Sequence, residues 1–382
     1  MTKKRILLVG DGNHQFITNY TVWLNKQSNI KFQIDILSLS LVNNSNADYY
    51  NKIYSINDNS SISSTINQIK GVRRYYRFLQ YKKLLQKLPE YDFIHFHFIS
   101  VDCYFLVDQL KKHTKSKIIL SIWGSDMYKV KPVNEKGFIQ SCHRADYITF
   151  TNQKSIEYFA SKYNWVKNNL KLCRFGLAPL ENLKELKASK SECKNILNWN
   201  KDKLAITIGY NLASAQQHLK ILDLFETDEI KAFKNQIQLI FPITYGGNEK
   251  YKNQILEKLN HLPYECKVYD TFLEDKTITY IRKASDIMIQ LQETDQFSGS
   301  MQEHLFARNI VITGSWLPYE TMKEKGVWFI EINKIAELVE VLPKIINHYT
   351  EYELKTVDSP NAITKLSSWE KNIKSWIDLY KY

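Results

Sequence analysis

Short, continuous apolar runs alternate along this chain with stretches of helical periodicity, and this alternation occurs twice. Apolar runs of strand length that lack alternate polar residues are typical of parallel strands buried on both faces. In the first half they predict strands at residues 5–9, 33–39, 93–98, 117–122, 147–150 and 170–174. The stretches between them predict helices at residues 15–27, 62–88, 101–113 and 153–162. The first half is therefore expected to form a doubly wound α/β domain.

The alternation resumes after a charged, weakly patterned segment at residues 179–202, which we interpret as a linker that could carry one helix. Strands are then expected at residues 204–208, 238–243, 267–269, 287–291, 310–313 and 327–330. Helices are expected at residues 215–225, 249–259, 276–283, 302–307 and 335–346. The chain thus predicts one Rossmann-like domain over residues 1–178 and a second over residues 203–364. Two such domains of similar size predict a central cleft that the loops at the carboxyl ends of both sheets face.

Composition places the chain among globular proteins and limits its partners. It has 382 residues, of which 44% are hydrophobic and 24% charged, enough for two ordered domains. The net charge of +12 favours an anionic partner, such as nucleic acid, a membrane surface or a phosphorylated substrate. No apolar run approaches the length of a membrane span, and Met-Thr-Lys-Lys-Arg leads directly into the first strand, so we expect a cytoplasmic protein. Five scattered cysteines form no Cys-x-x-Cys pair, which predicts buried thiols rather than a zinc site or disulfides.

The segment most informative about function is the loop that follows the apolar run at residues 287–291 and leads into a short apolar helix. Two acids, Asp295 and Glu303, flank this loop. A loop beyond the carboxyl end of a strand that feeds a helix N-terminus is where open α/β sheets bind nucleotides and sugars. Carboxylates placed there can accept hydrogen bonds from sugar hydroxyls. The alternative is a surface loop with two solvated acids.

This segment resembles the acid-x7-acid element of group 1 glycosyltransferases of the GT-B fold. Asp295-Gln296-Phe297-Ser298 matches the part that carries the first acid, and Glu303-His304-Leu305-Phe306 matches the part that carries the second. The resemblance implies that Asp295 lies near the donor sugar and that Glu303 holds the ribose of a nucleotide sugar. The chain departs from the family pattern at four positions, where Asp295, Ser298, Arg308 and Ile310 replace Glu, Gly, Gly and Pro.

Two further segments, residues 208–220 and 241–251, are similar to transferases that add 4-acetamido-4,6-dideoxygalactose (Fuc4NAc) to a lipid-linked saccharide. The first is a strand, loop and helix whose amides predict an anion cradle, with Asn211 and His218 as in that family. It lacks the Arg and the Lys-Gly by which group 1 enzymes neutralise the donor diphosphate. Lys220 or Arg282 could supply the missing positive charge. The second matches the family's Pro-x-x-Tyr-Gly…Tyr segment.

These motifs define the donor-binding residues that we expect. Tyr245 is expected to stack on a base or sugar, the adjacent glycines to let backbone approach the donor, and the serine-rich turn to offer hydroxyls and amides to a phosphate. The alternatives for the polar members are helix caps and surface solvation. The full set is Gly209, Asn211, His218, Lys220, Tyr245, Gly246, Gly247, Phe297, Ser298, Gly299, Ser300 and Glu303.

Three motifs follow or lie on strands of the first domain. The turn at residues 10–15 is not Gly-x-Gly-x-x-Gly, which disfavours a dinucleotide cofactor, and no Gly-x4-Gly-Lys-Ser/Thr loop indicates an ATPase. Residues 92–97 resemble the family's Asp-x-x-His-x-His strand, whose histidines would face one layer each or both lie near the strand end. Residues 123–126 resemble its His-Gly-x-Asp, with Trp123 in place of His.

The resemblance assigns these residues to the acceptor side and to catalysis. Asp126 could accept a proton from an acceptor hydroxyl, although an Asp in this position can also cap a helix. For the histidines, the alternative is a buried ring that is hydrogen-bonded to backbone. The expected catalytic residues are Asp126, Asp295 and His14, and the expected acceptor-side residues are Gly12, Asn13, His97 and Trp123.

Basic and aromatic side chains interleave on the helix predicted at residues 62–88. The cations are Arg73, Arg74, Arg77, Lys82 and Lys83. Such a surface favours peripheral docking on an anionic membrane, here the inner face of the cell membrane. The alternative is a solvated face whose aromatic residues pack inward. Nucleic-acid binding fits the same composition, but no nucleic-acid module is recognisable and none is expected as a partner.

The tail at residues 365–382, with its Trp-Glu and Tyr, resembles the terminal helix of GT-B enzymes, which crosses back onto the first domain. The alternative is an ordinary amphipathic end helix.

We therefore expect a GT-B glycosyltransferase that moves a sugar from a nucleotide-sugar substrate to a saccharide acceptor. The acceptor is expected to be lipid-linked, in the synthesis of a bacterial surface polysaccharide such as lipopolysaccharide or capsule. No Asp-x-Asp triplet occurs, and the resemblance implies no metal and no cofactor beyond the donor. The donor nucleotide (UDP, GDP or TDP) and the stereochemical outcome stay open. The alternatives are a hydrolysing sugar-nucleotide epimerase of the same fold and a non-catalytic basic protein that binds nucleic acid or membrane.

Overall fold

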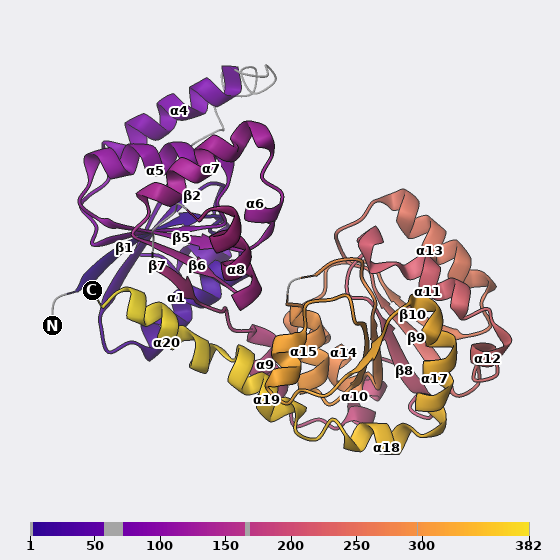
Figure 1. Ribbon diagram of the computed structural model, residues 1–382. Helices are drawn as coiled ribbons and strands as arrows, with labels where there is room; N and C mark the ends of the chain where they lie inside the picture. Colours follow the sequence, from indigo (N-terminus) through magenta and orange to yellow (C-terminus); the bar gives the residue numbers. More distant parts are fainter. Residues whose placement is uncertain (1–2, 57–71, 165–168, 296, 382) are drawn as a thin grey trace. The chain divides into compact units, whose positions relative to one another are not determined.

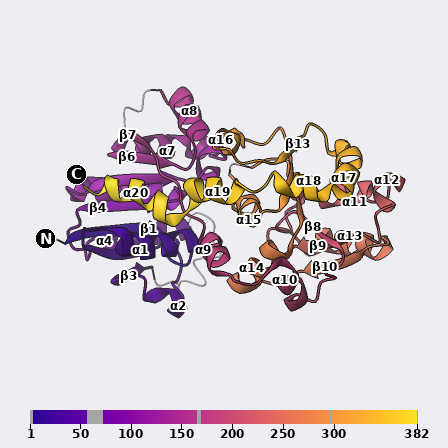
Figure 2. The same ribbon diagram turned by 90° about the horizontal axis from the view of Figure 1, so that it is seen from below.

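A computed structural model describes residues 3–56, 72–164, 169–295 and 297–381 of the chain. The chain folds into two compact units (Figures 1 and 2). Unit 1 is formed by residues 1–176 and 372–382, and unit 2 by residues 177–371. Each unit is built on a parallel sheet with helices on both faces. The predicted α/β architecture of two Rossmann-like sheets is therefore confirmed.

Unit 1 contains a seven-stranded sheet in the order β3-β2-β1-β4-β5-β6-β7. Its strands are β1 (Lys4–Gly10), β2 (Phe32–Ser38), β3 (Lys52–Ser55), β4 (Phe93–His97), β5 (Lys117–Ile122), β6 (Tyr147–Phe150) and β7 (Asn169–Leu172). Its helices are α1 (Gln15–Gln27), α2 (Asn44–Ala47), α4 (Val72–Leu85), α5 (Val101–His113), α6 (Ser125–Tyr128), α7 (Pro132–Arg144), α8 (Gln153–Lys162) and most of α20 (Trp369–Leu379). Figure 1 shows α4, α5 and α7 on one face of this sheet and α1 and α20 on the other.

Unit 2 contains a six-stranded sheet in the order β10-β9-β8-β11-β12-β13. Its strands are β8 (Leu204–Ile208), β9 (Ile237–Pro242), β10 (Glu265–Tyr269), β11 (Ile287–Gln290), β12 (Ile310–Gly314) and β13 (Ile330–Ile332). Its helices are α9 (Ala178–Glu185), α10 (Lys190–Ile196), η1 (Ser214–Gln216), α11 (His218–Leu224), α12 (Asp228–Lys231), α13 (Glu249–His261), α14 (Asp275–Ala284), α15 (Gly299–Phe306), α16 (Glu320–Glu324), η2 (Ile335–Glu337), α17 (Leu338–Asn347), α18 (Tyr349–Leu354) and α19 (Ser359–Ser367).

The elements expected from the apolar runs occur close to their predicted positions, with a few informative differences. β3 was missed because it is a four-residue edge strand without a continuous apolar run. Residues 179–202, expected as a linker, carry α9 and α10, which pack within unit 2. The part of the predicted helix at residues 62–71 lies outside the described residues, and α4 begins at Val72.

An aspartate placed just before a strand ties neighbouring strands together in both units. Asp92, Asp146 and Asp286 precede β4, β6 and β11, and each carboxylate accepts a backbone N–H group of the adjacent strand region. The carboxylate oxygen of Asp92 lies 2.7 Å from Arg5 N, that of Asp146 lies 2.8 Å from Ile118 N, and that of Asp286 lies 2.8 Å from Ala205 N. Because the N–H of each aspartate also binds the carbonyl of that same neighbour, each pair of strands begins in a fixed register.

The end of α20 belongs to unit 1 and is held there by buried polar contacts. Tyr380 Oη lies 2.5 Å from both His95 Nδ1 and Tyr20 Oη, and His95 Nε2 lies 2.6 Å from Ser121 Oγ. Trp376 Nε1 donates to the carbonyl of Arg174 at 2.8 Å. These bonds join α1, β4, β5 and the segment after β7 to the last helix of the chain.

Two expectations from composition concern the cysteine thiols and membrane-spanning helices. Four of the five thiols are buried as predicted, and Cys266 is partly buried. Within the described ranges, no helix is both long enough and apolar enough to span a membrane.

Candidate active site

The loops that follow β8, β9, β11 and β12 meet at the carboxyl edge of the unit 2 sheet. Leu212 N donates to Tyr245 O at 2.6 Å, which joins the first two loops. Gln217 Nε2 donates to Leu291 O at 2.6 Å and Gln216 Nε2 to Gln292 Oε1 at 2.7 Å, which adds the third loop. Trp316, in the loop after β12, donates from Nε1 to Gln292 O at 2.9 Å, which adds the fourth loop. Most of the expected donor-binding residues therefore lie on one connected group of loops.

Glu303 is buried in α15 and is held by an arginine from α14. Arg282 Nε donates to Glu303 Oε2 at 2.9 Å, and both residues are 7% exposed. Arg282 Nη1 also lies 3.2 Å from the buried His304 Nε2. The guanidinium is always charged and has fixed donor directions, so it fixes the orientation of the carboxylate. This contact also corrects one expectation: Arg282 is engaged by Glu303 and is not a cation exposed for a diphosphate.

The second oxygen of Glu303 lies next to the start of α15. A Cβ on Gly299 would lie 3.9 Å from Glu303 Oε1, an ordinary contact distance, and 3.2 Å from Leu177 Cδ2. Ser298 caps the helix, with its Oγ accepting Met301 N at 3.1 Å. Ser300 Oγ is buried and has no hydrogen-bond partner among the described residues. The turn thus offers a carboxylate oxygen, a hydroxyl and the first amides of a helix to one region.

Asp295 and Phe297 lie on the other side of this turn. Asp295 accepts a short hydrogen bond from the hydroxyl of the buried Tyr319, which follows β12. Phe297 packs against the hydrophobic cluster that contains Met301 and Tyr319. The contact with Tyr319 orients the first acid of the motif as Arg282 orients the second.

The loop after β8 contains buried polar atoms that have no partner within the described structure. His218 is 0% exposed, its Nδ1 lies 3.4 Å from Tyr251 Oη, and its Nε2 is without a partner, as is Gln216 Oε1. A Cβ on Gly209, which has a φ of +63°, would lie 2.8 Å from His218 Nε2. Burial lowers the pKa of His218 to about 4, so the ring is neutral at pH 7. Asn211 is turned into the loop, where its Oδ1 accepts Ala213 N at 2.9 Å.

Exposed residues of this edge complete the expected donor side. Lys220 Nζ donates to Gln217 Oε1 at 2.8 Å, and its side chain is 64% exposed. Tyr245 is 58% exposed, and Gly246 has a φ of +91° that favours glycine. A Cβ on Gly247 would lie 2.3 Å from Leu212 O, so this glycine is required by loop packing.

In unit 1, Gly12 and Asn13 form hydrogen bonds with other residues of the protein. Gly12 is buried, and its N–H donates to Ser38 Oγ at 3.1 Å. Asn13 Nδ2 donates to Leu41 O at 2.6 Å, and Asn13 Oδ1 accepts Asn43 N at 2.8 Å. The polar atoms of Asn13 therefore stabilise the loop after β2.

His14 is the N-cap of α1, and its Nδ1 accepts Phe16 N at 3.2 Å. Burial lowers the pKa of His14, against the opposing effect of Asp11. A neutral ring whose Nδ1 accepts a hydrogen bond carries its proton on Nε2. In this tautomer His14 presents an N–H donor rather than a base.

The carboxylate of Asp126 binds three backbone amides. Its oxygens accept Ile99 N at 2.9 Å, Trp123 N at 3.0 Å and Gly124 N at 2.7 Å, and the residue is 6% exposed. Burial raises the pKa of Asp126, whereas these hydrogen bonds oppose the rise. These contacts join the loops after β4 and β5. They are not a helix cap, because the N-cap of α6 is Gly124 and Asp126 lies within the helix.

Rings gather at the carboxyl edge of unit 1. The Trp123 ring lies 4.7 Å from His14, 5.7 Å from Phe16 and 5.4 Å from Phe175, measured between centroids. Phe98 is 5.9 Å away, 40% exposed, and has a φ of +61° that is unusual for a residue with a side chain. Trp123 Nε1 is buried without a partner in the described part of the chain. We call Trp123, His14, Phe16, Phe98 and Phe175 the aromatic cluster.

His97 lies beneath this cluster rather than at its surface. It is 1% exposed, stacks on His95 at 4.2 Å, and neither ring nitrogen has a partner among the described residues. Burial lowers the pKa of His97 to about 3. The two histidines share one face of β4 because residues i and i+2 of a strand point the same way. This corrects the expectation of one histidine in each layer.

The outer face of α4 is both basic and apolar. Tyr75, Leu79, Lys82 and Lys83 are exposed, whereas Tyr81 is buried. Arg77 Nη2 pairs with Asp102 at 2.7 Å and joins α4 to α5, which corrects its assignment to the exposed surface. The side chains of Arg73 and Arg74 lie outside what the structure describes.

Several residues of the two edges were not expected from the sequence. Tyr319, Trp316 and Gln292 surround Asp295 or its loop, and Phe98 adds to the aromatic cluster. In the sequence, only their position just after predicted strands could have indicated them, because none of them belongs to a spaced motif. No group of three or more His, Cys, Asp or Glu side chains that could hold a metal ion occurs in the described ranges.

The chain is similar to known proteins in part of its sequence and in its fold. Residues 5–152 match the family model described as "Glycosyl transferase 4-like". Sucrose-phosphate synthase (tll1590) from Thermosynechococcus elongatus has a TM-score of 0.72 at 12% identity, covering 99% of this chain and 98% of that chain. A glycosyltransferase from Rickettsia africae ESF-5 has a TM-score of 0.72 at 14% identity, covering 100% and 98%. Anabaena Alr3699/HepE, solved in complex with UDP and glucose, has a TM-score of 0.72 at 10% identity, covering 99% of each chain. No curated protein sequence matches the chain.

The structural likenesses show that the chain has the GT-B fold. Residues 5–152, which belong to unit 1, also match a glycosyltransferase family model, so this part of the chain is similar to glycosyltransferases.

Proposed function

We propose that this protein transfers a glycosyl group from a nucleotide-sugar donor, bound at the carboxyl edge of unit 2, to a hydroxyl of a saccharide acceptor. The observation that carries the proposal is the buried carboxylate of Glu303, which Arg282 holds by one oxygen while the other lies beside Gly299. A fixed carboxylate at the carboxyl edge of a parallel sheet is suited to accept hydrogen bonds from ribose hydroxyls. The UDP complexes of HepE support this choice of donor class.

The diphosphate would be bound mainly by neutral donors. The amides at the start of α15, the hydroxyl of Ser300 and the ring of His218 are the groups that we assign to it. The neutral His218 can donate through Nε2 if Nδ1 accepts from Tyr251 Oη. Lys220 is the cation we assign to the outer phosphate. Such donors, fixed before reaction, stabilise negative charge as the diphosphate departs.

Aromatic residues would hold the base and position the sugar. Tyr245 and Trp316 are both exposed at this edge and offer faces for stacking. We assign Asp295, oriented by Tyr319, to the donor sugar. The glycines at 209, 246 and 247 keep the loops compact enough for backbone to approach the donor.

The nucleotide part of this proposal has a direct test. Among UDP, GDP and TDP, at least one is expected to raise the melting temperature of the protein by about 5 °C or more at a concentration of 100 times its Kd. Thermal denaturation with each diphosphate measures this. Failure of all three to stabilise the protein would remove the donor assignment.

The acceptor would be recognised by the aromatic cluster of unit 1. His14 would donate a hydrogen bond from Nε2, and Trp123 would offer a ring for the apolar face of a sugar. We expect Trp123→Ala to raise the KM for a saccharide acceptor about tenfold, with hydrolysis of the donor in the absence of acceptor unchanged. Trp23→Ala, on α1, is the matched control. Equal KM values for the two variants would rule out the cluster as the acceptor site.

We further propose that α4 docks unit 1 on an anionic membrane, where a lipid-linked acceptor for a surface polysaccharide would be found. The exposed Tyr75 and Leu79 would enter the interface while Lys82 and Lys83 meet lipid phosphates. Lys82→Glu/Lys83→Glu is expected to reduce sedimentation with vesicles of anionic lipid at least tenfold. The control is Lys231→Glu/Lys234→Glu, which reverses two exposed lysines of unit 2. Identical sedimentation of the two variants would refute docking by α4.

A further inference from the structure

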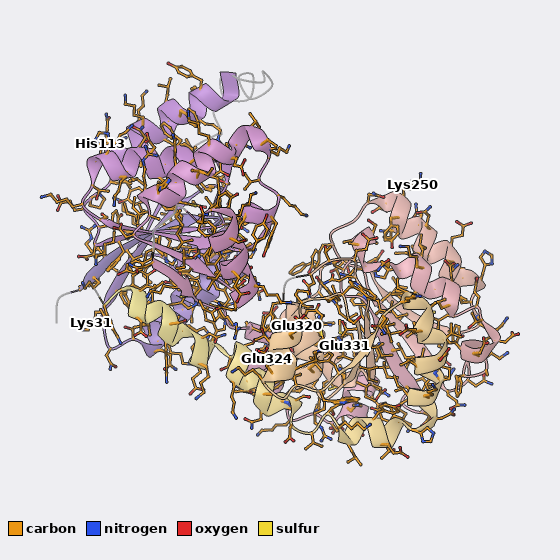
Figure 3. The ribbon with its side chains drawn as sticks, viewed as in Figure 1. Lys31, His113, Lys250, Glu320, Glu324 and Glu331 are labelled. Carbon is orange, nitrogen blue, oxygen red and sulfur yellow. The ribbon has the colours of Figure 1, made fainter. Side chains whose placement is uncertain are left out.

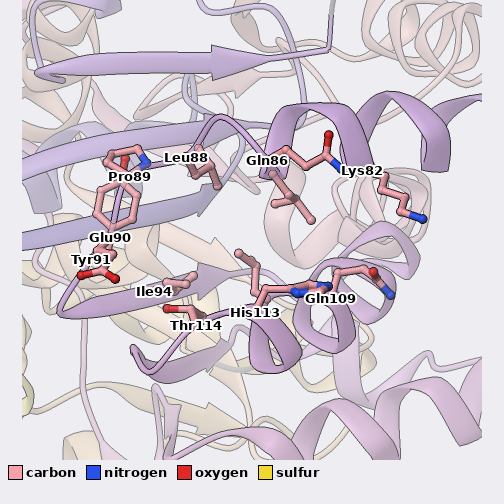
Figure 4. A pocket seen from close by; sticks show the side chains of 12 residues that line it. Lys82, Gln86, Leu88, Pro89, Glu90, Tyr91, Ile94, Gln109, His113 and Thr114 are labelled. Carbon is pink, nitrogen blue, oxygen red and sulfur yellow. The ribbon is translucent and has the colours of Figure 1, made fainter.

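A cavity of about 420 Å³ lies in unit 1 beneath α4, away from both groups of loops described above. Side chains from α4, the loop after it, β4 and α5 line it (Figure 4). β4 begins and α5 ends at this point, so the cavity lies at the amino edge of the sheet, whereas the aromatic cluster lies at the carboxyl edge. Its volume falls within the range of small-molecule sites.

One part of the cavity wall is apolar, and the polar residues Gln86, Gln109 and Thr114 also line the cavity. The apolar part is formed by Leu85, Leu88, Pro89, Ile94 and Leu110. Ile94 and Leu110 belong to the core of unit 1, and Leu85 and Leu88 pack against that core. The polar part of Tyr91 is turned away, because its hydroxyl donates to Asp35 at 2.7 Å. This wall matches a hydrocarbon chain better than a sugar or a nucleotide.

The surroundings of the cavity are basic. Lys82 and His113 line it and are exposed, with Glu90 as the one carboxylate among the lining residues. Parallel strands begin at the same edge, and the residues just before or at the start of these strands include Lys4, Lys31, Lys115 and Lys117. Figure 3 shows the labelled Lys31 and His113 at this edge of unit 1. Two carboxylates of the same edge, Asp92 and Asp146, accept backbone N–H groups.

We propose that this cavity binds one hydrocarbon chain of an anionic phospholipid, with the lipid phosphate placed between Lys82 and His113. An apolar wall next to a basic opening fits an amphiphile that has an apolar chain and a negative head group. The outer face of α4, which we propose to dock on a membrane, shares Lys82 with the cavity. The lipid is thus expected to come from the same leaflet, so the inference deepens the proposed membrane association. Binding of a single lipid does not require glycosyl transfer.

The test uses lysophosphatidylglycerol, a single-chain anionic lipid, below its critical micelle concentration, titrated into the full chain by calorimetry. We expect saturable binding at one site. Lysophosphatidylcholine with the same chain is expected to bind about fivefold more weakly because it lacks the net negative charge. Glycerol phosphate, the head group without the chain, is expected not to bind. Absence of saturable lysophosphatidylglycerol binding, or equal affinity for all three ligands, would overturn the proposal.

Two variants locate the site. Leu85→Trp places a larger ring in the cavity and is expected to abolish binding, whereas Leu354→Trp, at a 64% exposed leucine of unit 2, is expected to leave it unchanged. Lys82→Glu alters only an exposed side chain, so it keeps the test valid if Leu85→Trp fails to fold, and we expect it to weaken binding at least fivefold. Unchanged affinity in both cavity variants would place the lipid elsewhere. A protein that binds this lipid but no nucleoside diphosphate would retain the inference and lose the proposed donor, and the reverse result would do the opposite.

Discussion

Replacing Glu303 with alanine is expected to weaken binding of the nucleoside diphosphate by about 100-fold, because it removes charge-assisted hydrogen bonds to the ribose. The same change leaves the buried guanidinium of Arg282 without its carboxylate. Binding should therefore be measured by calorimetry at a temperature where the variant is folded. Glu303→Gln keeps the shape and an acceptor oxygen for Arg282 but loses the charge, and it is expected to have an intermediate affinity.

A modified ligand separates the ribose contact from a general loss of structure. The wild-type protein is expected to bind the 2′,3′-dideoxy form of the nucleotide much more weakly than the natural form. Glu303→Ala should bind both forms with similar affinity, because the group that distinguishes them is gone. Glu340→Ala, at an exposed glutamate of α17, is the control that should retain full discrimination. If Glu303→Ala discriminates as well as the wild type does, Glu303 does not hold the ribose.

Asp286→Ala is expected to destabilise unit 2 by about 3–5 kcal/mol, because it leaves the buried ammonium group of Lys194 without a counter-charge. Asp286 Oδ2 lies 2.6 Å from Lys194 Nζ, and Oδ1 lies 2.9 Å from Lys190 Nζ. Lys194 is only 5% exposed, so water cannot replace the carboxylate. Calorimetric unfolding should show the transition of unit 2 lowered by about 10 °C.

The matched control is an aspartate that also accepts the backbone N–H group at the start of a neighbouring strand but is more exposed. Asp146 also caps a neighbouring strand and pairs with Lys111 at 3.2 Å, but both side chains are more than a third exposed. Asp146→Ala is therefore expected to cost about 1 kcal/mol. A loss in Asp286→Ala no larger than that in Asp146→Ala would contradict the account of the buried cluster.

The same cluster predicts a dependence of stability on pH. Burial by itself would raise the pKa of Asp286, but the charges of Lys190 and Lys194 outweigh it and hold the pKa below its ordinary value. A carboxyl whose folded pKa is depressed stabilises the fold at pH values above its unfolded pKa, near 3.9. This contribution is lost as the pH falls through the folded pKa. Asp286→Ala should therefore lose less stability on acidification below pH 4 than the wild type does.

Much of the fold could be predicted from the sequence because both sheets are parallel and buried. Strands such as β5 and β8 are continuous apolar runs, and their residue ranges were predicted without error. The edge strand β3 has an exposed Lys52 and only four residues, which leaves no comparable pattern. The presumed linker proved to contain two helices because its buried residues, such as Cys193 and Leu180, are spaced among many charged ones.

The partners of the candidate site residues could not be predicted in the same way. Residue type indicated that Asp126 and Arg77 are charged, but only the fold shows that Asp126 binds three amides and that Arg77 pairs with Asp102. Arg282 reaches Glu303 across 21 positions through the packing of α14 against α15. Tyr319 orients Asp295 from a loop after β12, and no spacing rule connects the two.

The central claim is that the carboxyl edge of unit 2 holds a nucleotide sugar, and hydrogen exchange tests it most directly. Exchange is measured by mass spectrometry with and without the nucleoside diphosphate that stabilises the protein. We predict slower exchange in residues 209–218 and 297–303 when the nucleotide is present, because these amides lie in the two turns that we assign to the donor. Protection confined to unit 1, or unchanged exchange in both of these segments at saturating nucleotide, would contradict the account.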